Sequence, residues 1–229
     1  MWIKNIADHI IYEDREIIVC HKPAGIAVQN ARVGAMDMES GLKNYLAKKK
    51  PGKIPYLGVV HRLDQPVEGV LVFAKTSAAA AALSRQMRSG QMGKHYLAVT
   101  EKRPQQTAGI LEDFLIKDGK TNTSSVAFSD TPGAKKARLC YKLAGERQGK
   151  YLLAITLETG RHHQIRVQMA HAGMPLAGDR KYNADAKDGI SLGLCAHRLE
   201  FRHPGNGKKM QFQVVPQGSA FEGFQSICS

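Results

Sequence analysis

The residues best suited to chemistry form one short polar segment, His61-Arg62-Leu63-Asp64, which lies shortly before the apolar run Val70–Ala74. A carboxylate displayed on a loop between two strands is a common arrangement for a catalytic group. Arg62 supplies an opposite charge that favours the ionised carboxylate a nucleophile requires. The same two side chains could equally form a salt bridge within a turn, so this segment alone leaves both interpretations open.

A second polar segment runs from Arg161 to Arg166. Arg161 stands where a helix is expected to begin, and its positive charge there opposes the helix dipole, which favours an anion nearby. His162 and His163 cannot face the same side of a helix, and His171 has no carboxylate at metal-binding spacing, so no metal site is expected. For each of these histidines a hydrogen-bonded or exposed imidazole is the favoured interpretation.

A third feature is Lys94, which leads into an apolar run that contains Tyr96. Tyrosine in a strand usually fills the edge of a core. In a basic cleft, however, its ring can stack on a nucleobase and its hydroxyl can transfer a proton.

The elements that must position these residues are mostly strands. β-branched and aromatic runs predict strands over residues 16–20, 56–60, 70–74, 95–100, 137–143, 151–157, 195–201 and 210–215. Helices are predicted over 77–89, with Ser77 as N-cap, over 162–171 and over 39–48. Strands that outnumber helices without regular alternation favour an α+β fold around a mixed, mostly antiparallel sheet, with no confident domain boundary.

The net charge of +13, from 33 Lys and Arg against 20 Asp and Glu, favours a polyanionic partner such as nucleic acid. A merely basic protein fits the charge about equally well. The four cysteines form no CxxC pair, which indicates reduced thiols, and acidic residues interrupt the N-terminal segment where a secretory signal would be apolar. We therefore expect a cytoplasmic protein with no membrane span. P-loop, GxGxxG, GxSxG and HExxH motifs are absent from the sequence.

Taken together, three ordered segments resemble the motifs of the RluA-like family of RNA pseudouridine synthases. They are HRLD, KHYLAV and TGRHHQIRVQMAHAGMPLAGDRKY. The resemblance extends from about Ile11 to about Pro204, so we expect one catalytic domain over residues 11–216 and no separate RNA-binding domain. It implies an α+β fold with a basic cleft, a structured ribosomal or transfer RNA as partner, and no metal or organic cofactor. We expect a monomer.

The resemblance also implies roles for individual residues. Asp64 matches the family's catalytic aspartate, Tyr96 the tyrosine that packs on the target base, and Arg166 the arginine that pairs with the aspartate. Arg62 matches the arginine that fills the gap left by a flipped uridine. The expected RNA-binding residues are His61, Arg62, Lys94, Arg161 and His163.

One departure from the family pattern concerns Val67 and Glu68, which stand where the family usually has Thr-Ser. We expect Glu68 to place an extra acid close to the cleft, where it could repel RNA phosphate. Two alternatives to a pseudouridine synthase therefore remain open. One is a non-catalytic RNA-binding protein on the same scaffold, and the other is a glycosidase with Asp64 and Glu68 facing each other about 5 to 10 Å apart.

Overall fold

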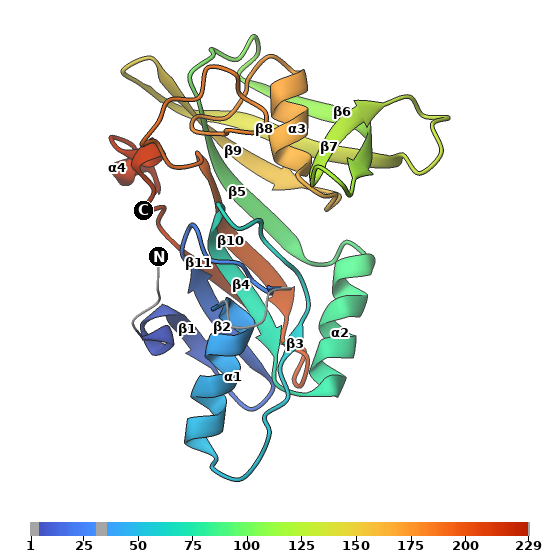
Figure 1. The fold of residues 1–229 in the computed structure, drawn as a ribbon, viewed down its shortest axis with the longest axis vertical. Helices are drawn as coiled ribbons and strands as arrows, with labels where there is room; N and C mark the ends of the chain where they lie inside the picture. The colour runs from blue at the N-terminus through green and yellow to red at the C-terminus, as the bar shows by residue number, and fades with distance from the viewer. Residues whose placement is uncertain (1–4, 31–35, 229) are drawn as a thin grey trace. The chain divides into compact units, whose positions relative to one another are not determined.

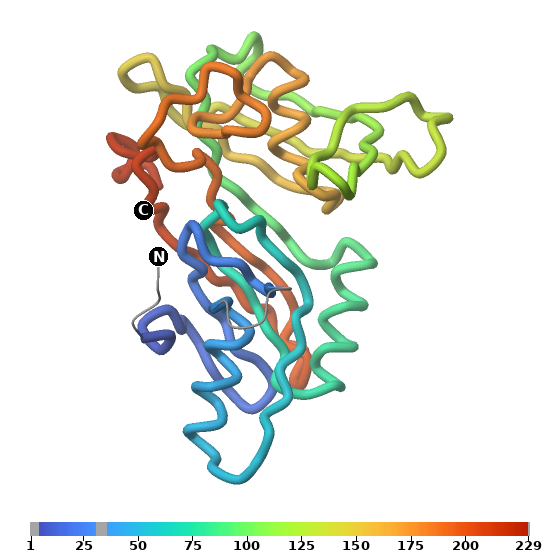
Figure 2. The backbone as a smooth tube through the Cα atoms, viewed as in Figure 1, coloured from blue at the N-terminus to red at the C-terminus, as the bar shows by residue number. Residues whose placement is uncertain are grey.

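The computed structural model describes residues 5–30 and 36–228. The chain clusters into two compact units. The first is formed from Met1–Gly93 and Ala196–Val214, and the second from Lys94–Cys195 and Val215–Ser229. A late segment of the chain therefore returns to complete the first unit, as the path in Figure 2 shows. The single catalytic domain expected over residues 11–216 stays a prediction.

The first unit is a sheet with two longer helices (Figure 1). Its strands follow the order β1-β2-β4-β10, and β3 and β11 pair with β4 and β10. The elements are a 3-10 helix η1 (Ile6–His9), β1 (Ile10–Glu13), β2 (Ile17–Lys22), α1 (Met38–Lys49), β3 (Gly58–Val59), β4 (Glu68–Ala74), α2 (Ser77–Arg88), β10 (Leu194–Arg202) and β11 (Lys209–Gln213).

The centre of this unit is β4, in which every residue is buried. Its apolar run is continuous rather than alternating, as expected for a strand covered on both faces. Strand β2 pairs with it antiparallel, and α2 packs against β3 and β4. The side chains of Asp37 and Thr76 cap α1 and α2 by accepting hydrogen bonds from Ser40 and Ala79.

The second unit is an antiparallel sheet in the order β5-β9-β8-β6-β7. Helix α3 packs against β6 and β7. Part of the core between them is formed by Leu115, Ala137 and Val167. The elements are β5 (Gly93–Thr100), β6 (Ala108–Asp118), β7 (Thr123–Ala127), β8 (Lys135–Arg147), β9 (Lys150–Leu157), α3 (Gln164–His171), a 3-10 helix η2 (Ser219–Phe221) and α4 (Gln225–Cys228).

The expected α+β class with a mostly antiparallel sheet is confirmed, and each of the eight predicted strands overlaps an observed one. Three strands were not predicted: β1, β6 and β7. The N-cap of α2 is Thr76 rather than Ser77, and α3 begins at Gln164 because His163 adopts a left-handed conformation. None of the helices within residues 5–30 and 36–228 is both long and apolar enough to cross a membrane.

Gly69 is required by the close approach of β4 to β10. Its φ is +138°, and a Cβ added there would lie 2.5 Å from the backbone nitrogen and oxygen of Ala196. Both atoms belong to a strand inside the sheet, so neither can move aside without disturbing the backbone. This constraint lies one residue after Glu68 and fixes how β4 begins.

Gly69→Ala should lower the free energy of unfolding by about 1 to 3 kcal/mol or more, because the added methyl group meets backbone and the φ value is strained. Denaturant unfolding measures the change. The matched control is Gly119→Ala, since a Cβ at Gly119 would meet nothing within 4 Å. Equal stability of the two variants would contradict the close packing of β4 on β10.

Candidate active site

Asp64 lies on the loop that joins β3 to β4. Leu63 and Val67 on either side are buried, whereas Asp64 is half-buried and Arg62 is exposed. The backbone N–H of Val67 donates to the carbonyl of Asp64 at 3.0 Å, which closes a tight turn through Gln65. The loop therefore anchors its apolar residues and leaves its polar ones accessible.

A second segment of the same unit ties this turn down. Gly25 donates its N–H to the carbonyl of Gln65 at 2.8 Å, and the Gln65 side chain donates back to the carbonyl of Gly25 at 3.0 Å. Lys22 adds a third bond, from Nζ to the same carbonyl of Gln65 at 3.0 Å. Gln65, the residue next to Asp64, is thus held by three hydrogen bonds that involve Lys22 at the end of β2 and Gly25 just after it.

Lys22, at the end of β2, supports this loop and was not predicted from the sequence. It is fully buried, although lysine is among the residue types least often buried completely. Its Nζ also donates to the carbonyls of Pro23 and Ile26, at 3.0 and 2.7 Å. In the sequence, Lys22 stands two residues after the predicted strand 16–20 and directly before Pro23, and this pattern does not indicate burial.

His61 and Arg62 line a hollow of about 350 Å³ beside the Asp64 loop. The N–H of Val72 donates to Nε2 of His61 at 3.2 Å, so this imidazole is fixed against β4 with Nε2 as acceptor. The remaining lining residues are Gln29, Glu39, Leu57, Val59 and Val60. Asp64 is not among these lining residues, and the expectation that His61 and Arg62 bind RNA stays a prediction.

The structure corrects the expectation for Glu68. Only 3% of the residue is exposed, and its Oε2 lies 3.8 Å from Nε2 of His21 on the neighbouring strand. Glu68 is the first residue of β4, and because its side chain is buried it does not present its charge to RNA phosphate. A buried carboxylate also cannot face a bound sugar opposite Asp64. The hypothesis of a glycosidase that uses Asp64 and Glu68 is therefore wrong.

The second unit carries the other predicted residues. Lys94 and Tyr96 are half-buried on β5, two residues apart and therefore on the same face of the strand. A Cβ at Gly160 would lie 3.2 Å from Nζ of Lys94, so this ammonium sits over the turn that leads to Arg161. Burial, followed by the charge of Arg161, lowers the pKa of Lys94. Two cations gathered in this way favour an anionic ligand.

Gln164 shapes the turn that carries Arg161. Its Oε1 accepts hydrogen bonds from the hydroxyl of Thr159 at 2.8 Å and from the N–H of Arg161 at 2.9 Å. The guanidinium of Arg161 donates from Nε to the carbonyl of Lys136 at 2.8 Å. The observed helix begins at Gln164, so Arg161 lies before it in an ordered turn rather than in its first turn.

Arg166 forms a buried, bidentate ion pair with Asp179. Nε and Nη2 donate to the two carboxylate oxygens at 2.8 and 2.7 Å, and the two side chains are 4% and 0% exposed. The ring of Tyr182 lies 5.1 Å from the guanidinium carbon. Two parallel bonds and an aromatic face fix the plane of the guanidinium.

Tyr182 contacts His163 as well as Arg166. The hydroxyl of Tyr182 accepts the N–H of Ser124 at 2.8 Å and lies 2.6 Å from Nδ1 of His163. The His163 backbone has φ +53°, and its ring stacks on that of His162 at 3.8 Å between centroids. A left-handed conformation of a residue other than glycine costs on the order of 1 kcal/mol and is often found at functional sites. Because His163 is buried, its expected contact with RNA stays a prediction.

His61, Arg62 and Asp64 thus lie in the first unit, and Lys94, Tyr96, Arg161, His163 and Arg166 lie in the second. The expected pairing of Arg166 with Asp64, and the packing of Tyr96 on a base beside Asp64, stay predictions. Within the described ranges, no group of three His, Cys, Asp or Glu side chains gathers as metal ligands would.

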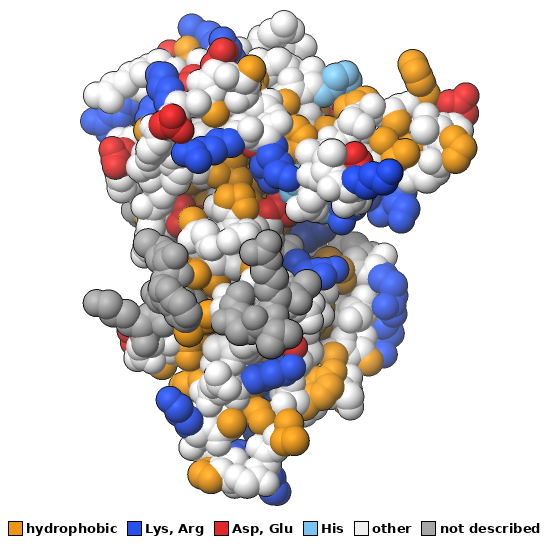
Figure 3. Space-filling model, viewed as in Figure 1, with side chains coloured by type: hydrophobic (Ala, Val, Ile, Leu, Met, Phe, Trp, Pro, Cys, Tyr) orange, Lys and Arg blue, Asp and Glu red, His pale blue; other side chains and the backbone are white. Residues whose placement is uncertain are grey.

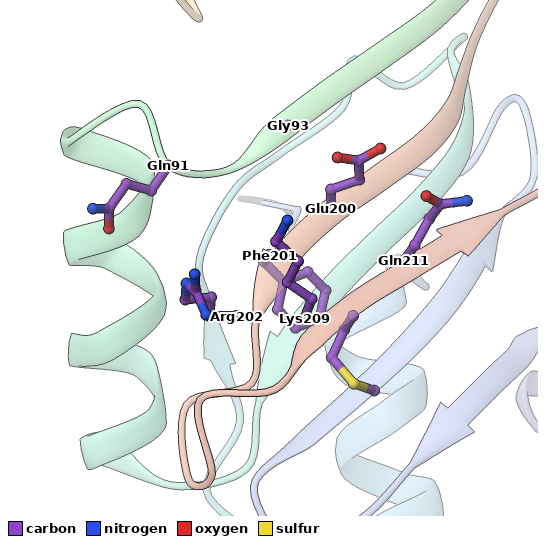
Figure 4. A pocket seen from close by; sticks show the side chains of 8 residues that line it. Gln91, Gly93, Glu200, Phe201, Arg202, Lys209 and Gln211 are labelled. Atoms are coloured by element: carbon purple, nitrogen blue, oxygen red, sulfur yellow. The ribbon is translucent and has the colours of Figure 1, made fainter.

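A further pocket, of about 470 Å³, lies along β10 and β11 and is drawn in Figure 4. Its lining includes the cations Arg202 and Lys209 together with the acid Glu200, and Gln91 and Gln211 add neutral amides. Because the lining contains both cations and an acid, the pocket has no clear preference for an anionic ligand. None of the residues named for the Asp64 loop belongs to this pocket.

Comparison with known proteins assigns the family. The family model for RNA pseudouridylate synthase matches residues 16–171, which include the Asp64 loop, Tyr96 and Arg166. The chain belongs to the RNA pseudouridylate synthase family. This membership makes it an isomerase that converts uridine in RNA to pseudouridine, and it sets aside the reading as a non-catalytic RNA-binding protein.

Several members of the RNA pseudouridylate synthase family are similar over most of the chain. Ribosomal large subunit pseudouridine synthase C of Buchnera aphidicola is 32% identical over 96% of this chain and 71% of its own length. The Escherichia coli protein of the same name is 33% identical over 91% and 66%. The solved structure of human RNA pseudouridylate synthase domain containing 4 is 21% identical, with a TM-score of 0.79 over 97% of this chain and 92% of its own. The similarity to the human structure supports the α+β fold.

Asp179→Ala should lower the free energy of unfolding by about 3 to 5 kcal/mol, because it leaves the guanidinium of Arg166 buried without its carboxylate. Thermal and denaturant unfolding measure the loss. The control is Asp188→Ala, whose pair with Arg180 is largely exposed and should contribute little. Similar losses for the two variants would show that the buried pair does not hold this part of the second unit.

Proposed function

We propose that this protein converts specific uridines in the RNA of the large ribosomal subunit to pseudouridine, with Asp64 as the catalytic carboxylate. The observation that supports Asp64 most strongly is its placement. It is a half-buried acid on a turn held by three hydrogen bonds through its neighbour Gln65. A catalytic group needs this fixed geometry, because a displacement of about 1 Å can cost a hundredfold in rate.

The ribosomal substrate is inferred from the relatives. Those of Buchnera aphidicola and Escherichia coli are named for the large ribosomal subunit, and they are about one third identical to this chain. Transfer RNA is the second candidate, since it offers similarly structured uridines. Either RNA would be met in the cytoplasm, and we propose that the protein acts there as a monomer.

The reaction exchanges one bond for another. The bond between the ribose anomeric carbon and the ring nitrogen breaks, and the detached uracil turns. A bond from the anomeric carbon to carbon five then forms, carbon five loses its proton, and the nitrogen regains one. The composition is unchanged, so no electrons enter or leave. Asp64 acts in its ionised form, whether it attacks the sugar, removes a sugar proton or adds to the base.

The other residues act on the base and the RNA backbone. Tyr96 stacks on the extruded uracil and assists removal of the proton from carbon five. Asp179 fixes the guanidinium plane of Arg166 by two hydrogen bonds. In this proposal Arg166 also pairs with the Asp64 carboxylate. His61, Arg62, Lys94, Arg161 and His163 are the proposed RNA contacts, with Arg62 filling the gap left by the flipped uridine.

Positive charge on the surface favours such binding. On the face seen in Figure 3, Lys and Arg side chains are more frequent than Asp and Glu and include a column over α2, where Arg85 and Arg88 are exposed. Neutralising phosphates releases counterions, so affinity should fall as salt rises. Extruding the target uridine costs a few kcal/mol and is easiest where the base is unpaired.

Asp64→Asn should reduce tritium release from large-subunit ribosomal RNA labelled at carbon five of uridine by at least about a thousandfold. The amide keeps the size of the side chain and removes its nucleophilic charge. RNA affinity and melting temperature should stay close to those of the native protein, which separates lost chemistry from lost folding.

The control is Asp130→Asn, at an exposed aspartate of the second unit. This variant should keep native activity. Tritium release by Asp64→Asn at the native rate would overturn the assignment of Asp64.

A further inference from the structure

The hairpin of β10 and β11 has one apolar face and one polar face. Phe201 is 3% exposed, and its ring stacks on that of Phe212 at 5.9 Å between centroids. Neighbouring residues of a strand point to opposite faces, so Arg198, Glu200 and Arg202 lie on the other face of β10. The hairpin therefore packs its aromatic side chains on one side and presents charged side chains on the other.

The register of the hairpin places two cations directly opposite each other. Arg202 pairs with Lys209, and both are exposed. Like charges at opposite positions of an antiparallel pair are destabilising, because their Cβ atoms lie only about 4.5 to 5.5 Å apart. The Nη1 of Arg202 donates to a neutral acceptor, the carbonyl of Gly207, at 3.2 Å. Such a pair of cations favours an anionic ligand, whose charge offsets the repulsion.

Glu200 is the one acid among the described lining residues of this pocket, and it does not cancel these charges. Its Oε1 lies 3.1 Å from Nε of Arg198, a cation of the same face that is outside the lining. Arg198, Arg202 and Lys209 together oppose the single negative charge of Glu200. The lining alone has no clear charge preference, but the polar face as a whole is positive.

Helix α2 fixes the backbone that carries Arg202. Gln86 is 9% exposed, and its amide makes two hydrogen bonds to the backbone of Arg202. Nε2 donates to the carbonyl at 2.8 Å, and Oε1 accepts the N–H at 2.7 Å. The last turn of the same helix carries the exposed cations Arg85 and Arg88, so further positive charge lies on the helix that is bound to β10.

Gln91 and Gln211 add hydrogen-bonding groups without charge. A glutamine amide both donates and accepts, as contact with the edge of a nucleobase requires. Figure 4 shows both side chains at the pocket with Arg202 and Lys209. Its volume of about 470 Å³ is within the range of sites for small ligands. Paired cations beside amides match a nucleotide, which combines an anionic phosphate with a neutral base.

The pocket lies farther along the sheet than the Asp64 loop. Strand β4 meets β10 at Gly69 and Ala196, five residues after Asp64, and Arg202 is six residues beyond Ala196. At about 3.3 Å per residue, Ala196 and Arg202 are roughly 20 Å apart. A nucleotide bound at Arg202 is therefore separate from a uridine bound at Asp64.

We propose that the polar face of β10 and β11 is a second RNA-docking surface: Arg202 and Lys209 together bind one backbone phosphate of the substrate RNA, and Gln91 and Gln211 contact the nucleotide beside it. The surface adds affinity for a long, structured RNA and takes no part in the reaction at Asp64. This inference rests on the proposed function, because the RNA bound here is the substrate of the Asp64 site.

The double variant Arg202→Gln with Lys209→Gln removes both charges. Its Kd for a transcript of large-subunit ribosomal RNA should rise about tenfold. The slope of log affinity against log salt should decrease by about one, since one phosphate contact is lost. For tritium release, KM should rise while kcat stays native. The melting temperature should be unchanged or higher, because a repulsive pair has been removed.

The control is Arg103→Gln with Lys142→Gln, which removes the same two charges at exposed positions of the second unit and should keep the native Kd and salt slope. A native Kd for the variant at Arg202 and Lys209 would overturn the proposal, and so would equal weakening in the control. The Kd is measured without turnover. If the native protein releases no tritium, the proposed function fails, and this outcome is distinct from failure of the docking surface.

A photo-crosslinker tests the contact without removing a charge. Benzoylphenylalanine in place of Gln211 should crosslink to the transcript, whereas the same group in place of Gln106, exposed in the second unit, should crosslink little. Absence of a crosslink from position 211 would contradict the docking surface. Preferential crosslinking to added polyglutamate, which imitates an acidic protein partner, would overturn the choice of RNA.

Discussion

The interaction on which the site depends is the contact of one buried ammonium with three backbone carbonyls. Lys22, the last residue of β2, joins the segment that follows this strand to the turn that displays Asp64. Desolvating a lysine is costly, so its full burial is justified only if all three N–H groups are satisfied. The Asp64 loop is therefore fixed from inside, and its polar residues Arg62 and Gln65 stay exposed.

In the second unit, too, buried polar contacts hold the residues of the candidate site. Asp179 holds Arg166 by two parallel bonds, Tyr182 covers the guanidinium, and the Tyr182 hydroxyl reaches His163 at the start of α3. Each side chain in this series contacts a neighbour of matching chemistry. Such a network fixes side-chain orientation more strongly than apolar packing does, because a rotation would leave a buried polar group unpaired.

Patterns within a few residues were enough to predict much of the molecule. The apolar run Val70–Ala74 predicted a strand, and the polar residues before it predicted the Asp64 loop. Strand β6 was missed because its charged residues interrupt the β pattern, as in Glu112 and Asp113. The burial of Lys22 and Glu68, and the partnership of Arg166 with Asp179, depend on segments brought together by folding. Local sequence patterns do not specify such contacts.

The central claim is that Asp64 makes pseudouridine in large-subunit ribosomal RNA. Mapping of pseudouridine in total RNA tests it most directly, in cells lacking the gene that carry the native protein, the Asp64→Asn variant or neither. The account predicts that one or more positions in large-subunit RNA lose pseudouridine without the gene and regain it only with the native protein. An unchanged map, or restoration by Asp64→Asn, would contradict it.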